Sequence, residues 1–236
     1  MKILGIVAPL TLEARSLTSQ PIRAGGLVQL PGGTLVKVAG IGAEKALAAA
    51  ELLVAEGATA LLSWGSGGGL QPNLSPGNLI LPKTIIDLQK RILIADEAWH
   101  NRLYQSLGSH LPIHAEPLAQ SPTVLTTPVE KLDFFKQNAA IAVDTESGSV
   151  AEVASKANLP FMAIRAIVDT SDMTIPLSGL TAIDEYGGLR PMHLLGSLLR
   201  RPADLLLLNQ LRRNFTAART TLSTVAQLLG DDFLAF

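Results

Sequence analysis

The sequence contains no cysteine, and this absence removes several classes of chemistry at once. A chain without thiols has no disulfide, no zinc–thiolate site and no cysteine nucleophile. Histidine is also scarce, and the four histidines are scattered along the chain, at His100, His110, His114 and His193. A metal site built on histidine is therefore disfavoured, and we expect neither a bound metal nor an organic cofactor.

Charge of either sign is scarce as well. Of the 236 residues, 17% are charged, and 19 basic residues nearly balance 20 acidic ones, which gives a net charge of −1. Because binding to duplex DNA or RNA needs a basic excess, we expect no nucleic-acid partner. The 47% hydrophobic content excludes an intrinsically disordered chain.

Long apolar runs are absent too. No stretch of 18 apolar residues is present, so no segment is predicted to span a membrane. The apolar start at residues 1–8 is too short for a secretion signal with its flanking regions. We therefore expect a cytoplasmic protein.

Strand and helix patterns alternate over residues 1–170, which predicts an α/β fold. Continuous apolar strands between helices indicate a mixed β-sheet with helices on both faces. We predict a single domain over 1–236, with a core at 1–170 and a helical C-terminal extension at 190–230, joined by a polar connection. The expected strands are 3–7, 27–30, 35–38, 59–64, 78–81, 140–143 and 161–167, and the expected helices are 43–56, 96–107, 128–137, 147–157, 193–199 and 204–229.

A glycine-rich segment, Gly65–Gly69, follows one of the expected strands. Glycines let backbone N–H groups approach an anion or a sugar closely, and Ser66 adds a hydroxyl group. The segment matches neither of the two common glycine patterns that bind phosphate. A tight structural turn is the alternative interpretation.

Several charged residues lie at or near expected strand ends, where ligands bind in open α/β sheets. Asp144 and Glu146 have the spacing of two side chains on one strand face, although helix capping is the favoured explanation for Asp144. Arg165 in an apolar strand calls for an anionic partner, and Asp169 is either a general acid or a turn residue. Glu13, taken alone, is an ordinary exposed helix residue.

Five short segments occur in a fixed order along residues 1–170: Glu13 after the first strand, Gly40-Ile41-Gly42, Gly65-Ser66-Gly67-Gly68, Val143-Asp144-Thr145-Glu146-Ser147 and Arg165-Ala166-Ile167-Val168-Asp169. In this order they resemble the superfamily of purine nucleoside phosphorylases and methylthioadenosine/adenosylhomocysteine nucleosidases. The resemblance implies that fold and cleavage of an N-glycosidic bond.

The resemblance also implies catalytic roles. Glu146 matches the glutamate that holds the ribose hydroxyls, Asp169 the acid that protonates purine N7, and Glu13 the glutamate that activates water. An aspartate must be protonated to act as an acid near pH 7. We therefore expect burial to raise the pKa of Asp169.

Further residues match groups that contact the substrate. Ser66, with its neighbour Gly67, and Arg165 match positions near the nucleophile. Val124 and Leu125 lie where the family has the wall of the purine site.

Two departures from the family pattern bear on substrate and nucleophile. Thr145, in the substrate site beside the ribose glutamate, replaces an apolar methionine. Ser63 stands where bacterial phosphorylases of this superfamily carry an arginine that binds phosphate, so the sequence favours water as the nucleophile. Arg15 and Arg165 leave phosphate open as a co-substrate.

The C-terminal part carries Thr174-Ile175-Pro176-Leu177, a Gly/Asp loop, Leu194–Leu199, Arg200-Arg201-Pro202 and a Leu-rich helix. These features resemble the hopanoid-associated phosphorylases. The resemblance implies removal of adenine from adenosylhopane, a lipid-linked nucleoside of hopanoid biosynthesis.

The same segment combines leucines with Arg200, Arg201, Arg212 and Arg213, and the mean hydropathy of the chain is +0.32. This pattern is typical of an interfacial helix, which would bring a peripheral contact with the inner membrane face. A core-packing or dimer-forming helix is the alternative. Family members are commonly oligomers, so the resemblance also implies a homo-oligomer.

Three functions are consistent with the sequence. The first is a nucleosidase for an adenosine with a large apolar 5′ group, such as adenosylhopane. The second is a nucleosidase or phosphorylase for a small soluble nucleoside, such as methylthioadenosine. The third is a non-catalytic nucleoside- or lipid-binding module, because fold alone does not fix activity.

Overall fold

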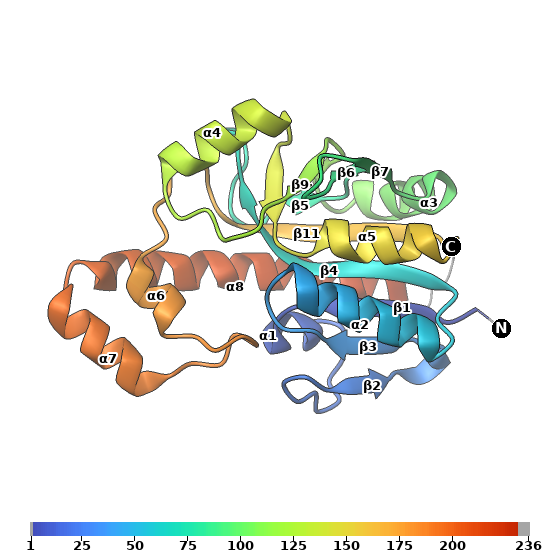
Figure 1. Ribbon diagram of the computed structural model, residues 1–236, viewed down its shortest axis with the longest axis horizontal. Helices are drawn as coiled ribbons and strands as arrows, with labels where there is room; N and C mark the ends of the chain where they lie inside the picture. The colour runs from blue at the N-terminus through green and yellow to red at the C-terminus, as the bar shows by residue number, and fades with distance from the viewer. Residues whose placement is uncertain (1, 231–236) are drawn as a thin grey trace.

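The computed structural model describes residues 2–230 and confirms the predicted mixed β-sheet with helices on both faces (Figure 1). At the centre lies β4 (Ala60–Gly69), which is parallel to β1 (Leu4–Ala8) on one edge and to β11 (Phe161–Asp169) on the other. β3 (Leu35–Val38) continues the sheet beyond β1. The parallel strands β1, β4 and β11 therefore end at one edge of the sheet.

The shorter strands extend this centre on both sides. Along one path the order is β2-β3-β1-β4-β10-β9-β6-β7, and β11 pairs with β4 and β5 outside that path, while β5 pairs with β8. These strands are β2 (Leu27–Gln29), β5 (Leu79–Ile80), β6 (Thr84–Ile86), β7 (Ile92–Ile94), β8 (Ile113–His114), β9 (Leu118–Gln120) and β10 (Ala142–Asp144).

The helices divide between the two faces of the sheet. α2 and α5 lie side by side on one face, and α8 crosses the other face together with α3 (Figure 1). The helices are α1 (Thr11–Ala14), α2 (Ala43–Ala55), α3 (Glu97–Gly108), α4 (Pro128–Asn138), α5 (Ser147–Lys156), α6 (Leu177–Thr181), α7 (Pro191–Arg200) and α8 (Asp204–Leu229).

Each face has its own hydrophobic core because the strands of the sheet centre are buried on both sides. Small residues of α2, such as Ala46 and Ala50, let this helix pack closely against α5. On the opposite face, Trp99 of α3 and Leu222 and Val225 of α8 are buried against the sheet. The second half of α8 thus belongs to the main core.

The glycine segment Gly65–Gly69 is not a turn, so the prediction of a strand that ends at residue 64 was wrong. β4 continues through all five glycine-region residues and stays paired with β11 as far as Gly68. None of these glycines has a positive φ. Pairing with β11 on one edge and with β10 on the other keeps this stretch extended. Glycine is present here because other groups of the protein lie close to the backbone.

The C-terminal helices lie where the sequence predicts them, and α8 has the predicted bounds. The connection at 170–190 contains the short helix α6, which the sequence analysis did not predict. α7 buries none of its residues, and it projects away from the sheet with α6 (Figure 1). No helix within residues 2–230 is long and apolar enough to cross a membrane.

We expect Leu222→Ala to lower the free energy of unfolding by about 2–5 kcal/mol, because it leaves a cavity between α8 and the sheet. Leu222 is 1% exposed, whereas Leu206 on the same helix is 79% exposed. Leu206→Ala should therefore change stability by less than about 0.5 kcal/mol. Urea unfolding measures both, and equal losses would contradict this placement of α8.

Candidate active site

A cavity of about 200 Å³ lies at the edge of the sheet where β1, β4 and β11 end. It brings together eight of the nine residues predicted from the sequence, although they are up to 156 positions apart along the chain. Arg165 is the predicted residue that does not line it. The eight that do are Glu13, Ser66, Gly67, Val124, Leu125, Thr145, Glu146 and Asp169.

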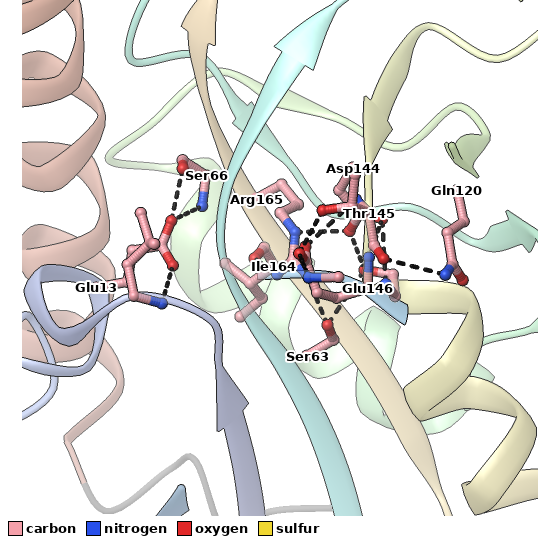
Figure 2. A network of polar contacts seen from close by, with 12 residues as sticks. Glu13, Ser63, Ser66, Gln120, Asp144, Thr145, Glu146, Ile164 and Arg165 are labelled. Carbon is pink, nitrogen blue, oxygen red and sulfur yellow. Dashed lines mark hydrogen bonds and ion pairs between the residues drawn. The ribbon is translucent and has the colours of Figure 1, made fainter. Parts of the chain in front are cut away.

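Glu13 is buried rather than exposed, because α1 folds back over the end of β4. The carboxylate accepts hydrogen bonds from the Ser66 amide (2.7 Å) and hydroxyl (2.5 Å) at Oε1, and from the Leu10 amide (3.0 Å) at Oε2 (Figure 2). The Trp64 indole N–H donates to the Glu13 carbonyl and to Ser16 Oγ, which fixes α1 on the strand. Burial raises the pKa of Glu13, against the hydrogen bonds from Ser66.

The glycines of β4 make room for these carboxylates. A Cβ on Gly65 would lie 2.9 Å from Glu13 Oε2, and a Cβ on Gly68 would lie 3.0 Å from Asp169 Oδ2. A side chain at Gly65 would therefore displace the Glu13 carboxylate, and one at Gly68 would push the Asp169 carboxylate by a few tenths of an ångström. The glycine-rich segment Gly65–Gly69 is therefore an extended stretch of strand against which the side chains of two acids pack.

Glu146 occupies the N-cap position of α5, directly after β10. Its Oε1 accepts a hydrogen bond from the Gly42 amide (2.9 Å) at the start of α2, and the Thr145 hydroxyl donates to the same oxygen. Burial and the neighbouring Asp144 carboxylate raise the pKa of Glu146 to about 7, against the nearby charge of Arg165. The group therefore changes charge near neutral pH.

Arg165 lies behind the cavity, so its predicted place near the nucleophile is corrected by the structure. The side chain is 0% exposed, and its Nε donates to Asp144 Oδ2 at 2.7 Å. Its two terminal nitrogens donate to Ser63 Oγ (2.7 Å) and to the Ile164 carbonyl (3.0 Å) (Figure 2). Each nitrogen of the guanidinium is thus engaged by the protein.

Asp144 combines the two interpretations that the sequence left open. Oδ1 accepts the amides of Glu146 (3.2 Å) and Ser147 (3.1 Å), which caps α5 as predicted. Oδ2 pairs with Arg165 and accepts from the Ser147 hydroxyl. Because a buried arginine without a partner is very costly, this pair accounts for a cation in an apolar strand.

Asp169 ends β11 at a β-bulge. Ile167 pairs with Gly67 and Asp169 with Gly68, so Val168 is the extra residue. The bulge lets both Val168 and Asp169 line the cavity, because it breaks the alternation of side chains along the strand. Burial raises the pKa of Asp169, as the sequence analysis predicted, although an ion pair with Lys131 opposes this rise.

The sequence analysis missed Lys131 and most of the apolar wall. A lysine in a short amphipathic helix carries no signal that distinguishes a buried side chain from an exposed one. The apolar wall lies mainly on elements after residue 170, where the sequence predicts a polar connection and a Leu-rich helix at 204–229 but no residue of the site. Its members are Leu10, Ile41, Ile175, Leu180, Ile183, Leu211 and Phe215.

The cavity is acidic on one side and apolar on the other. Glu13, Glu146 and Asp169 line it together with a fourth acid, Asp144, which is paired with Arg165, and no lysine or arginine among the described residues lines it. Within residues 2–230 there is also no group of three histidine, aspartate or glutamate side chains arranged to hold a metal ion. The arrangement can supply a proton, accept a proton and stabilise a developing positive charge.

Comparisons with known proteins identify a family and a shared fold. A family model described as the Phosphorylase superfamily matches residues 28–178. The native structure of futalosine hydrolase of Helicobacter pylori is similar, with a TM-score of 0.68 and 15% identity over 96% of this chain and 97% of that chain.

Two nucleosidase structures are also similar to this chain. One is a putative 5′-methylthioadenosine/S-adenosylhomocysteine nucleosidase from Francisella philomiragia, with a TM-score of 0.69, 16% identity and coverage of 100% of this chain and 99% of that chain. The other is such a nucleosidase from Colwellia psychrerythraea in complex with adenine, with a TM-score of 0.69, 15% identity and coverage of 98% and 95%. At these identities the three structures show a shared fold.

We expect Glu146→Gln to raise the melting temperature at pH 8 by about 2–8 °C, or about 1–2 kcal/mol. The pKa of about 7 in the folded state exceeds the ordinary value of 4.5, so the native state binds the extra proton. Wild-type stability therefore falls as the pH rises from about 4.5 to about 7. Glutamine stays neutral and avoids this loss, and the gap should close toward pH 5.

Glu152→Gln is the matched control. Lys156 and Arg91 lower the pKa of Glu152, so its pKa shift is opposite in direction to that of Glu146. That variant should gain no stability at pH 8. A lower melting temperature for Glu146→Gln than for the wild type at pH 8 would contradict the claim that the buried Glu146 carboxylate destabilises the folded state.

Proposed function

Because the chain belongs to the Phosphorylase superfamily, and is therefore a nucleosidase or a nucleoside phosphorylase, we propose that it hydrolyses the N-glycosidic bond of a 5′-substituted adenosine and releases adenine. The observation that carries the proposal is the convergence of three buried carboxyl groups on a cavity whose described lining has no cation. Family membership also favours an enzyme over a non-catalytic binding module.

In the proposed reaction each acid has one task. Asp169 gives its proton to purine N7. The C1′–N9 bond breaks, and the electron pair of this bond passes to the purine. The Glu146 carboxylate binds the ribose hydroxyls and stabilises the positive charge that develops on the sugar. Glu13 accepts a proton from the water that attacks C1′.

Water is favoured over phosphate by the electrostatics of the cavity. A phosphate dianion would enter beside three carboxyl groups and would find no lining cation to pair with. Arg15 is exposed on the protein surface, and Arg165 is bound to Asp144 and Ser63. Neither arginine therefore offers phosphate a partner in the cavity.

The proposed substrate is adenosylhopane. This step rests on the resemblance of the C-terminal part to hopanoid-associated phosphorylases and on the apolar wall formed by Ile175, Ile183, Leu211 and Phe215. A hydrocarbon 5′ group has favourable contacts with such a wall, whereas a charged group has none.

A small soluble nucleoside is the second candidate. The similar structures include nucleosidases for methylthioadenosine and adenosylhomocysteine over nearly the whole of this chain. The modest volume of the cavity, about 200 Å³, also favours a small 5′ substituent.

The assay that tests the proposal measures adenine release from adenosylhopane and from methylthioadenosine, each with and without phosphate. We expect adenine from adenosylhopane at a rate that phosphate leaves unchanged. A phosphate-dependent rate would contradict hydrolysis, and release from methylthioadenosine alone would contradict the lipid-linked substrate.

Asp169→Ala should lower kcat by about 10²–10⁴-fold, because the leaving purine loses its proton donor. The control is Asp133→Ala, which removes a carboxyl group that is 59% exposed and does not line the cavity. Full activity of Asp169→Ala with a working substrate would contradict the assignment of the acid.

The exposed face of α7 supports a further part of the proposal, peripheral contact with an anionic membrane. Met192, Leu195 and Leu199 lie along the helix at 78%, 55% and 79% exposure, and Leu206 at the start of α8 is 79% exposed. From residue 186 to 203 the formal charges are Arg190, Arg200 and Arg201, with no acidic residue. Apolar side chains beside cations suit the inner membrane face of a cell.

Vesicle flotation tests this contact. The protein should float with vesicles that contain phosphatidylglycerol and should not float with pure phosphatidylcholine. Leu199→Asp should abolish flotation, and Leu132→Asp, at a position 50% exposed on α4, should leave it unchanged. If Leu199→Asp instead converts a dimer to a monomer by light scattering, the face is an interface between copies of the expected homo-oligomer.

A further inference from the structure

Lys131 is a completely buried cation that holds the general acid from outside the cavity. Its side chain on α4 is 0% exposed, and Nζ lies 2.6 Å from Asp169 Oδ2. The same nitrogen donates to the carbonyls of Thr170 (2.6 Å) and Met173 (2.9 Å). Three N–H groups thus meet three acceptors, two of them in the loop that follows Asp169.

Burial of this lysine is not explained by the packing of α4. The helix is largely exposed, with Val129 at 68% and Leu132 at 50%, and within it Lys131 and Asn138 are the buried residues. Because an ammonium group loses its hydration when it is buried, an apolar residue at position 131 would pack at lower cost. The cation therefore serves the carboxyl group that it contacts.

The contact also divides the two oxygens of Asp169. Both oxygens lie close to Gly68, and Oδ2 is the one that is bound to Lys131. No other described residue donates a hydrogen bond to Oδ1. A proton on Asp169 therefore belongs on Oδ1, since Oδ2 already faces a positive charge.

We infer that Lys131 is a positioning residue that fixes Asp169 and stabilises the carboxylate formed when the proton leaves for the purine. The inference rests on the proposed function. In the step, the Oδ1–H bond breaks as the N7–H bond forms, and the electron pair of the C1′–N9 bond passes to the purine. The negative charge left on Asp169 then lies beside the Lys131 ammonium, which is permanently in place.

The two influences on Asp169 act in opposite directions. Burial raises its pKa, which keeps the proton in place near neutral pH, and Lys131 lowers it, which makes the group a stronger acid. Lys131 is the charged group that contacts Asp169 among the described residues. Other titratable groups around the cavity and in the following loop are Glu13, Asp144, Glu146 and Asp172.

The test compares Lys131→Gln with Lys131→Arg. Glutamine keeps a donor for the loop carbonyls and removes the charge, whereas arginine keeps the charge. For Lys131→Gln the alkaline limb of the kcat/KM profile should move up by about 1–3 pH units, because an unpaired Asp169 holds its proton more tightly. We expect kcat for adenine release to fall at least about tenfold, with KM nearly unchanged. Lys131→Arg should keep the wild-type limb.

A second substrate separates this role from a structural one. A 4-nitrophenyl riboside releases a stable phenolate that needs no proton from Asp169. Lys131→Gln should therefore lose far less activity with this substrate than with adenosine derivatives. Equal losses on both substrates with an unmoved alkaline limb would overturn the inference.

A measurement on the free protein keeps the inference independent of the proposed function. The carboxyl ¹³C signal of Asp169, assigned with Asp169→Asn, should titrate at a higher pH in Lys131→Gln than in the wild type. Identical midpoints would overturn the role of Lys131. Failure of the wild type to release any nucleobase would overturn the proposed function and would leave this titration as a valid test. If Lys131→Gln melts too early to titrate, the double variant with Asp169→Asn should recover stability, because it removes the unpaired acid.

Discussion

The bare backbone in the second half of β4 is the constraint on which the site depends. At Gly65 and Gly68 a carboxylate oxygen lies only 2.9 Å and 3.0 Å, respectively, from where a Cβ atom would stand. The central strand can therefore pair fully with β11 and still carry two acids against its surface. Ser66 is the one side chain in this stretch, and it is used to hold Glu13.

Positive charge in this protein lies behind the acids rather than in the cavity. Arg165 pairs with Asp144 from within the sheet, and Lys131 pairs with Asp169 from α4. Each cation is completely buried and bound by protein oxygens, so it does not offer itself to a bound anion. In the proposed reaction the cavity keeps a negative face toward a sugar that becomes positive, and the buried cations limit the cost of crowding the acids.

The sequence predicts the fold well and the site only partly, for identifiable physical reasons. Long apolar strands and amphipathic helices have sequence patterns that extend over many residues, so they are predicted well. α8, for example, was predicted with its observed bounds. Some strands of two or three residues, such as β8 and β9, were not predicted because they carry too few side chains for a pattern, and tertiary pairing forms them. The strand prediction ended before the glycines of β4, because glycine usually marks a turn. The hydrogen bonds that keep this stretch in the sheet come from β11, which is distant in the sequence.

The site residues divide in the same way. Arg165 was predicted to need an anionic partner, and Asp144 is that partner. That Arg165 does not line the cavity depends on which side of β11 its side chain leaves, and this cannot be read from the sequence. Glu13 has no local pattern that separates it from an exposed glutamate, so its place was predicted through the family resemblance. Lys131 had no signal at all, because its acid lies on a strand 38 residues further along the chain.

The poor packing of α7 has a consequence for how such proteins diverge. None of its residues is buried, so substitutions within α7 alter little of what stabilises the fold. The three acids, in contrast, are fixed by the strands and by α1, α2 and α5. Relatives can therefore vary this helix while the three acids of the proposed reaction stay where they are, so the surface that α7 presents can change without a refolded core.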